Sequence, residues 1–373
     1  MIYLDHNATT PVDADVREAM IDCLSDQFGN PSSLHGLGRK ARKILEDSRE
    51  KISQTIGASE DELFFTSGGT ESINLALRGS LQKIDPGLLK LGKPHIITTA
   101  VEHKAVLETL EELKKEGRLE VTLVGVDSKG RVKLEDFQKA LRPTTFLISM
   151  MWVNNEIGNI YPIEAIGHWV RSQKILFHVD AVQALGKLEI NLSKIPVDLM
   201  SLSAHKIYGP KGVGALYILS GVKVASCHTG GAQEMEKRGG TENLPGIVGF
   251  AQAVEKIDLK NDNSRIKILR QKLESGLAQI PQSHVQGDEG SRVANTLSMT
   301  FEGVESEMGI IALDREGIAV SSGSACASGA VEPSHVLLAM GVNRGEAKGV
   351  IRFSLGKSTT ESEIETVLKS FLK

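Results

Sequence analysis

Two stretches decide the fold of this chain, Phe177-His-Val-Asp-Ala-Val-Gln183 and Val197-Asp-Leu-Met-Ser-Leu-Ser-Ala-His-Lys206. Each begins as a short apolar run, which is typical of a buried strand, and each ends in polar residues. In α/β proteins, ligands bind at the carboxyl ends of parallel strands. We therefore expect the two polar ends to lie together at one binding edge of a sheet.

The same alternation of short apolar runs and amphipathic stretches extends from about residue 60 to residue 220. It predicts a mainly parallel sheet of seven strands that is buried on both faces by helices. The predicted strands are Glu62–Thr66, His95–Thr99, Val121–Val126, Thr145–Val153, Ile175–Val179, Leu199–Ser203 and Gly214–Ile218. The predicted helices between them include Glu102–Glu116 and Glu164–Ser172.

The remainder of the chain predicts a smaller α+β domain. Leu244–Ile257 has the pattern of a helix, and the polar Asn261–Ser264 is expected to break it, so we place a domain boundary there. Beyond it we expect strands at Asn295–Phe301 and Gly349–Ser354 and a closing helix at Thr360–Leu372.

Length and composition exclude several classes of protein. The 373 residues are enough for two domains, and the net charge of −4 without a basic cluster argues against a nucleic-acid surface. The longest apolar run, Phe146–Val153, is too short to span a membrane. From the first residues we expect no signal peptide, and three scattered cysteines predict neither disulfides nor a metal site. We expect a cytoplasmic protein that binds no metal.

Lys206 and Asp180 together predict a cofactor. Enzymes that use pyridoxal 5'-phosphate (PLP) hold it covalently through a lysine amine and place a carboxylate at the pyridinium nitrogen. Lys206 and Asp180 can fill these two roles, and Gln183 can hydrogen-bond the ring hydroxyl. Any one of these residues alone is more simply a surface charge or a strand cap. The set in this order favours PLP.

A phosphate site is predicted in Thr66-Ser-Gly-Gly-Thr-Glu-Ser72, which follows a strand and begins a helix. Gly69 and its neighbour free backbone N–H groups at the positive end of the helix, and Thr70 adds a hydroxyl donor. In isolation, an ordinary helix cap is the better explanation of this motif. Further donors beside Lys206 favour a phosphate site over an ordinary helix cap.

Nine motifs in this order resemble one family. The chain resembles the class V aminotransferase group of fold-type I PLP enzymes and, within it, cysteine desulfurases of the NifS/IscS type. The motifs run almost from end to end: Tyr3–Pro11, Phe28–Ser33, Thr66–Ser72, Glu102–Val106, Val153–Gly158, Ser203–Gly212, Arg238–Asn243, Ser321–Ser328 and Ile351–Gly356.

The resemblance implies the PLP fold-type I architecture. The large PLP-binding domain would comprise residues 15–260, and the small domain would comprise residues 1–14 and 261–373 and carry a catalytic cysteine loop. The resemblance also implies a homodimer, in which Thr241 reaches the cofactor phosphate of the neighbouring subunit. Ser203 and His205 would donate to the phosphate within the same subunit.

His103 and Asn155 also take their expected roles from the resemblance. His103 would be catalytic, stacking on the PLP ring and moving protons, which suits an imidazole with a pKa near neutrality. A surface histidine at a helix N-terminus is its simpler explanation. Asn155 would lie near the ring hydroxyl and the substrate carboxylate.

Arg352 is predicted to bind the substrate carboxylate. It lies inside the apolar run Val350-Ile-Arg-Phe-Ser-Leu355, and a buried arginine is costly unless it pairs with an anion. An internal Asp or Glu is the simpler partner. The resemblance favours an amino-acid carboxylate.

Cys326 narrows the choice among the reactions that PLP enzymes catalyse. It lies among small residues in Ser321-Ser-Gly-Ser-Ala-Cys-Ala-Ser-Gly-Ala330, which suits an exposed nucleophile better than a buried thiol. Its thiolate would take sulfur from PLP-bound cysteine and become a persulfide. Cys23 is expected to be buried in a helix, and the place of Cys227 is undetermined.

Two features depart from the family pattern. Met235 stands where relatives carry an arginine, which puts local substrate or phosphate contacts in doubt. The chain also stops at Lys373, soon after the last predicted helix, so docking to an IscU-like scaffold is a weaker expectation than catalysis.

These observations predict a PLP-dependent cysteine desulfurase. It would convert L-cysteine to L-alanine and pass sulfur from Cys326 to an acceptor protein for iron–sulfur cluster assembly or thiolation. One alternative is another class V PLP enzyme, such as a selenocysteine lyase or an aminotransferase, although an aminotransferase would not need Cys326. The other is a non-enzymatic sulfur carrier, which would not need the PLP residues.

Overall fold

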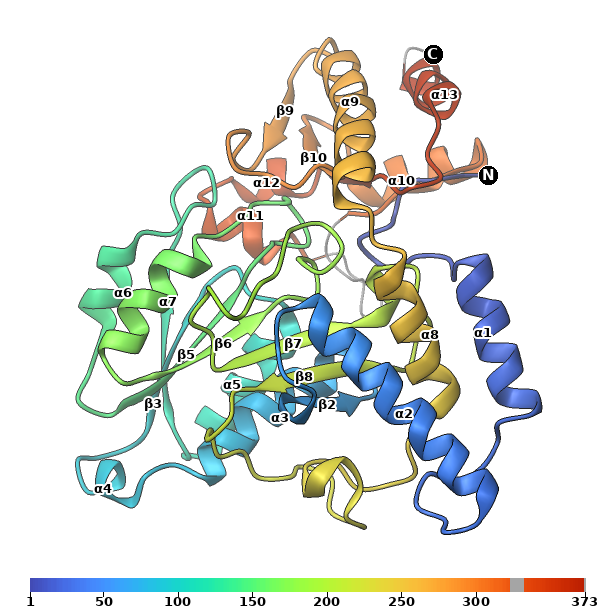
Figure 1. Ribbon diagram of the computed structural model, residues 1–373. Coiled ribbons are helices and arrows are strands. Elements are labelled where there is room, and N and C mark those ends of the chain that lie inside the picture. The colour runs from blue at the N-terminus through green and yellow to red at the C-terminus, as the bar shows by residue number, and fades with distance from the viewer. Residues whose placement is uncertain (323–331, 372–373) are drawn as a thin grey trace.

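The computed structural model describes residues 1–322 and 332–371. Figure 1 shows a large lower part, in which helices cover a twisted sheet, and a smaller upper part built mainly from the orange and red elements beside the N-terminus. None of the helices described is long and apolar enough to cross a membrane.

The large part contains the predicted seven-stranded sheet. Its strands lie in the order β2-β8-β7-β6-β5-β3-β4, and β8 is antiparallel to both of its neighbours while the other pairs are parallel. The strands are β2 (Leu63–Thr66), β3 (His95–Thr99), β4 (Glu120–Val124), β5 (Thr145–Met151), β6 (Leu176–Asp180), β7 (Leu199–Ser203) and β8 (Gly214–Ile218). Each predicted strand ends within two residues of the observed one, so the prediction of this sheet is confirmed.

Each strand sends alternate side chains into two apolar layers. Ile96 and Leu147 pack in the layer that contains α3 and α5, whereas Ile97 and Ile148 pack on the other face with α2, α6, α7 and α8. Successive strand residues point to opposite faces, so continuous apolar runs bury both. The helices are α2 (Gly36–Thr55), α3 (Gly69–Gln82), α5 (Lys104–Lys115), α6 (Leu134–Ala140), α7 (Ile163–Ser172) and α8 (Leu244–Glu255).

The small part is built on a second sheet of order β12-β10-β9, with antiparallel pairs. Its strands are β9 (Ser283–Gln286), β10 (Thr296–Phe301) and β12 (Val350–Ser354), and its core includes residues of α9 (Leu259–Leu277) and α13 (Glu361–Phe371). The N-terminal strand β1 (Ile2–Tyr3) pairs with β11 (Ile318–Ala319). The first residues of the chain therefore lie with this part, while the domain limits 1–14, 15–260 and 261–373 stay a prediction.

One prediction in this region is wrong. Asn261–Ser264 does not break a helix but lies in the first turns of α9. Asp258 caps this helix, and its side chain accepts a hydrogen bond from the backbone N–H of Asn261 at 3.2 Å. Short polar residues are favoured at helix starts because they satisfy free N–H groups, so the same composition marks a beginning as well as a break.

The remaining elements connect these layers. They are α1 (Ala14–Ser25), η1 (Glu60–Glu62), α4 (Pro86–Leu89), η2 (Ala204–Lys206), η3 (Gln233–Glu236), α10 (Ser306–Arg315), α11 (His335–Ala339) and α12 (Arg344–Ala347).

Candidate active site

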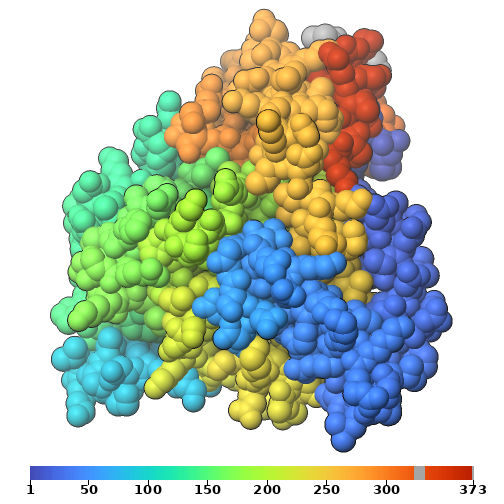
Figure 2. All heavy atoms as spheres, viewed as in Figure 1, coloured from blue at the N-terminus to red at the C-terminus, as the bar shows by residue number. Residues whose placement is uncertain are grey.

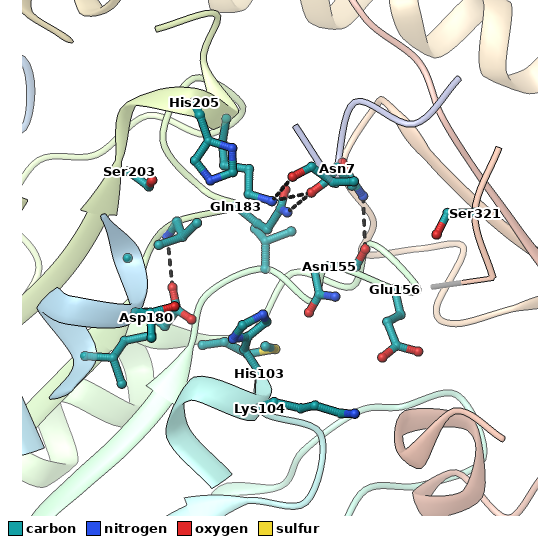
Figure 3. A pocket seen from close by; sticks show the side chains of 18 of the residues that line it. Asn7, His103, Lys104, Asn155, Glu156, Asp180, Gln183, Ser203, His205 and Ser321 are labelled. Atoms are coloured by element: carbon teal, nitrogen blue, oxygen red, sulfur yellow. Dashed lines mark hydrogen bonds between the residues drawn. The ribbon is translucent and has the colours of Figure 1, made fainter. Parts of the chain in front are cut away.

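A cavity of about 360 Å³ lies where the strands of the large sheet end and the small part begins. Its volume is within the range of about 300–1,000 Å³ that is usual for small-molecule sites. Figure 3 shows side chains pointing into it from several elements. The predicted residues that line it are Gly69, Thr70, His103, Asn155, Asp180, Gln183, Ser203, His205, Lys206 and Arg352.

Lys206 ends the short helix η2, directly after β7. Its amine donates hydrogen bonds to the backbone carbonyl oxygens of Asn7 (2.5 Å) and Ala8 (2.8 Å). Burial and then the positive charge of Arg352 lower the pKa of Lys206 to about 8. The lowered pKa increases the fraction of neutral, nucleophilic amine near neutral pH.

Asp180 and His103 face the same cavity from β6 and from the start of α5 (Figure 3). Burial raises the pKa of Asp180, although the charges of His103 and Lys206 oppose this. His103 is the N-cap of α5, and its Nδ1 accepts a hydrogen bond from the N–H of Ala105 at 3.1 Å. In the neutral imidazole this contact assigns the proton to Nε2.

The N-terminus of α3 offers an anion site. Its N-cap is Gly68, which has no side chain to cap the first N–H groups. Ser203 is 1% exposed, and its hydroxyl has no hydrogen-bond partner among the described residues. A Cβ built on Gly68 would lie 3.9 Å from this oxygen, so the hydroxyl is beside the helix end. A buried hydroxyl requires a partner, and the PLP phosphate fits this place.

Arg352 belongs to β12 and brings the small part to the cavity. Its guanidinium donates to Oδ1 of Asp5 (2.6 Å) and to the backbone oxygen of Asn155 (2.9 Å). The internal acid that the sequence offered as the simpler partner is therefore present. The buried Nε has no acceptor within the described part of the chain, which leaves one edge of the guanidinium for a substrate carboxylate.

Asn7 lines the cavity, but sequence reasoning gave it no role. It is 2% exposed, and its backbone and side-chain polar atoms all make hydrogen bonds. The partners on the small part are Asn295, Thr296 and Ser354, and the partners on the large part are Asn155, Gln183, Lys187 and Lys206. These residues lie 148 to 347 positions away in the sequence, so the motif Tyr3–Pro11 was the available signal. Lys104, Glu156 and His335 also line the cavity without having been predicted.

Of the predicted site residues, Thr241 and Cys326 are not among the described residues that line this cavity. Thr241 is exposed and is not among the residues that line it. Cys326 lies outside the described residues. Met235, one of the departures from the expected family pattern, is 47% exposed and also does not line the cavity. Nearby, Nε of Arg238 pairs with Oε1 of Glu71 at 3.1 Å.

The other two cysteines are poor candidates for the nucleophile. Cys23 is buried in α1, as predicted, and burial raises the pKa of its thiol. Cys227 is partly buried, and burial also raises the pKa of its thiol. A raised pKa leaves little reactive thiolate near neutral pH.

Comparisons with known proteins point in the same direction as the site. The family model described as aminotransferase class-V matches residues 2–367. The chain is 44% identical to a protein named cysteine desulfurase IscS from Methanosarcina thermophila, covering 99% of this chain and 90% of that protein. A second IscS from Dictyoglomus turgidum is 46% identical over 98% of this chain and 92% of its own length. A solved structure titled NIFS-like protein superposes with a TM-score of 0.92 at 43% identity, covering 99% of this chain and 97% of that one.

Proposed function

This chain belongs to the class V aminotransferase family, and we infer that it is a cysteine desulfurase that uses PLP. Its α/β fold is that of the fold-type I PLP enzymes, as the sequence predicts. The observation that carries the functional conclusion is the meeting of Lys206, Asp180 and the unpartnered Ser203 hydroxyl in one cavity. When bound, PLP supplies an electron sink that allows bonds of the attached amino acid to break.

The strand-end residues would hold the cofactor. Lys206 has the lowered pKa that covalent attachment through its amine requires, and Asp180 is buried where a carboxylate would pair with the ring nitrogen. The hydroxyl groups of Ser203 and Thr70, the imidazole of His205 and the backbone at Gly69 would bind the phosphate. Gln183 would contact the ring hydroxyl.

The substrate L-cysteine would bind between Arg352 and Asn155. Its carboxylate would take the free edge of the Arg352 guanidinium, whose orientation Asp5 already holds. When His103 is neutral it carries its proton on Nε2, so that atom is a hydrogen-bond donor; moving a proton at Nε2 would require the other ring nitrogen, Nδ1, to be released from the N–H of Ala105 and protonated. Burial lowers the pKa of His103, which favours the neutral form.

Cys326 would receive the sulfur. Its thiolate would attack the substrate sulfur and form an S–S bond while the substrate C–S bond breaks. The electron pair of that bond remains with the substrate carbon, which gains a proton and becomes the methyl group of alanine. The products are L-alanine and a persulfide on Cys326, so sulfur and electrons balance without an added oxidant. Cys326 lies outside the described residues, and its role rests on the sequence.

A homodimer would complete the phosphate site with Thr241 of the second subunit. Two observations support this part of the proposal: Thr241 is exposed rather than directed into the cavity of its own chain, and the segment around the end of α1 and the start of α2 exposes large apolar side chains. These are Ile21, Leu24, Phe28, Leu34 and Leu37. Figure 2 shows the blue segment that carries them on the surface of the molecule.

The destination of the sulfur is an acceptor protein, which we propose to be an IscU-like scaffold or a thiolation enzyme in the cytoplasm. The first destination follows from the resemblance of the motifs to IscS-type desulfurases, and the few scattered cysteines suit a reducing compartment. The acceptor would have to approach the segment that carries Cys326.

Product analysis tests the function. We expect the purified protein to be yellow with bound PLP and to release equal amounts of alanine and, in the presence of a reducing thiol, sulfide from L-cysteine. Conversion of cysteine to its 2-oxo acid with the sulfur retained, with the amino group passed to added 2-oxoglutarate, would contradict a desulfurase and favour an aminotransferase. Alanine formed from selenocysteine but not from cysteine would favour a selenocysteine lyase.

A further inference from the structure

A second amine, that of the half-buried Lys187, contacts Gln183 in the cavity wall and has no part in the function proposed above. Its Nζ donates a hydrogen bond to Oδ1 of Asn7 at 3.1 Å and another to Oε1 of Gln183. In the chain as described, no acidic side chain forms an ion pair with it. Burial, followed by the charges of Lys206 and Arg352, lowers its pKa well below the ordinary value.

The local chain path brings Lys187 to Gln183. After β6 the backbone forms consecutive turns, in which the N–H of Leu185 bonds the oxygen of Ala181 at 3.0 Å and that of Leu188 bonds the oxygen of Ala184 at 2.9 Å. Within these turns the side chains of Gln183 and Lys187, four positions apart, are in contact. Gly186 allows the path, because its φ is +74° and a Cβ there would lie 2.6 Å from Ile207.

Asn263 of α9 also fixes Lys187. Its side-chain amide donates to the backbone oxygen of Lys187 at 2.9 Å. The backbone of Lys187 is therefore tied to the start of the small-part helix, while its amine reaches the cavity wall. A side chain held at both ends can act as a fixed support for the residue that it contacts.

These contacts decide which way the Gln183 amide faces. Its Nε2 donates to the backbone oxygen of Asn7 at 2.9 Å, and its Oε1 accepts from Lys187. If the Gln183 amide were flipped, its oxygen would face the Asn7 carbonyl oxygen and its NH2 group would face the Lys187 amine. Both hydrogen bonds would then be lost. One N–H of Nε2 is used by Asn7, and the other remains for the cavity that Gln183 lines (Figure 3).

We propose that Lys187 is a positioning residue that holds the Gln183 amide with its NH2 group toward Asn7 and the cofactor cavity. Lys187 is not among the residues that line the cavity, and it acts through Gln183. This proposal rests on the proposed function, from which it takes the contact between Gln183 and the PLP ring hydroxyl. A purely structural lysine, which only anchors Asn7, is the competing explanation.

A double-mutant cycle on cofactor affinity separates the two explanations. The proteins are wild type, Lys187→Met, Gln183→Met and the double variant, with Lys194→Met as a control because Lys194 is an exposed lysine seven positions further along the chain. The measurements are the dissociation constant of PLP for each apoprotein and the absorption maximum of the bound cofactor. We expect Lys187→Met to weaken PLP binding about tenfold and to shift the maximum as Gln183→Met does. The double variant should bind no more weakly than Gln183→Met, and Lys194→Met should match wild type.

Three results would overturn the proposal. They are wild-type affinity and spectrum in Lys187→Met, losses of affinity that multiply in the double variant, and a Lys187→Met spectrum unlike that of Gln183→Met. If Lys187→Met does not fold, Lys187→Arg replaces it in the cycle, because a guanidinium keeps N–H donors for the oxygen of Gln183. The proposal predicts that Lys187→Arg keeps the wild-type absorption maximum, and a maximum shifted as in Gln183→Met would contradict it. A wild-type protein that binds no PLP would instead refute the proposed function.

Discussion

The cavity has two walls that are built differently. The strand-end wall, formed by Asp180, Ser203 and Lys206, comes from neighbouring strands within 27 positions of the sequence and is fixed by the hydrogen bonds of the sheet. The small-domain wall, formed by Asn7 and Arg352, joins the beginning of the chain to its end through side-chain hydrogen bonds. Under the proposed function, the first wall would hold the cofactor and the second would bind the carboxylate of the substrate.

The largest expected effect is on the strand-end wall. Lys206→Ala should abolish covalent PLP binding and lower turnover by at least about 1,000-fold, because no other amine would replace the nucleophile. Borohydride reduction followed by mass spectrometry would locate the attachment site. Lys211→Ala, which removes an exposed lysine nearby, should retain the adduct. A reducible adduct in Lys206→Ala would show that another lysine holds the cofactor and would contradict the role given to the strand-end wall.

Asp180→Asn should come next. Asparagine keeps an oxygen for the N–H of Val182 but removes the buried charge, so we expect PLP to bind while kcat falls about 100-fold. Turnover and the absorbance of bound PLP, measured on the same sample, would separate the two effects. Loss of the cofactor with unchanged activity per bound PLP would show that Asp180 serves only to retain it.

The strand-end wall was also the part that the sequence could predict. The ranges predicted for β3, β7 and β8 are those observed, because strand pattern and polar strand ends are local signals. The small-domain wall gave weaker signals. Asn7 was missed because its partners lie far away in the sequence, and Lys187 was missed because a single lysine in a sequence is most simply a surface charge. Asn261–Ser264 was misread because composition does not distinguish the start of a helix from a break. The sequence predicted that an internal acidic residue could pair with Arg352, but it did not identify Asp5 as that residue.

On the small-domain wall, Arg352→Gln should affect substrate binding more than cofactor binding. We expect KM for L-cysteine to rise about 30-fold with a smaller change in kcat, since a charged, two-point contact to the carboxylate is lost. PLP affinity should remain near that of wild type. Steady-state kinetics and cofactor titration would check both. A fall in kcat with KM unchanged would place Arg352 in a catalytic role.

A smaller effect is expected from the electrostatic interaction between the two walls. The positive charge of Arg352 helps to hold the pKa of Lys206 at about 8, so Arg352→Gln should raise that pKa. The neutral amine reacts with PLP, and the rate at which wild-type apoprotein takes up PLP should therefore rise through about pH 8 and then level. In Arg352→Gln the midpoint should move to higher pH. Stopped-flow absorbance across pH 6.5–10 would measure it, and identical midpoints would show that the walls are electrostatically independent.

The central claim is that cofactor chemistry and sulfur acceptance belong to separate groups, and alanine release from three cysteine variants tests it most directly. Cys326→Ser should bind PLP and change its absorption spectrum on addition of L-cysteine. It should release no alanine and form no protein persulfide, because an alcohol is a poor nucleophile toward sulfur. Cys23→Ser and Cys227→Ser should match wild type, since burial raises the pKa of both thiols. Alanine release by Cys326→Ser at near the wild-type rate would contradict the account and favour direct elimination from the cofactor-bound amino acid.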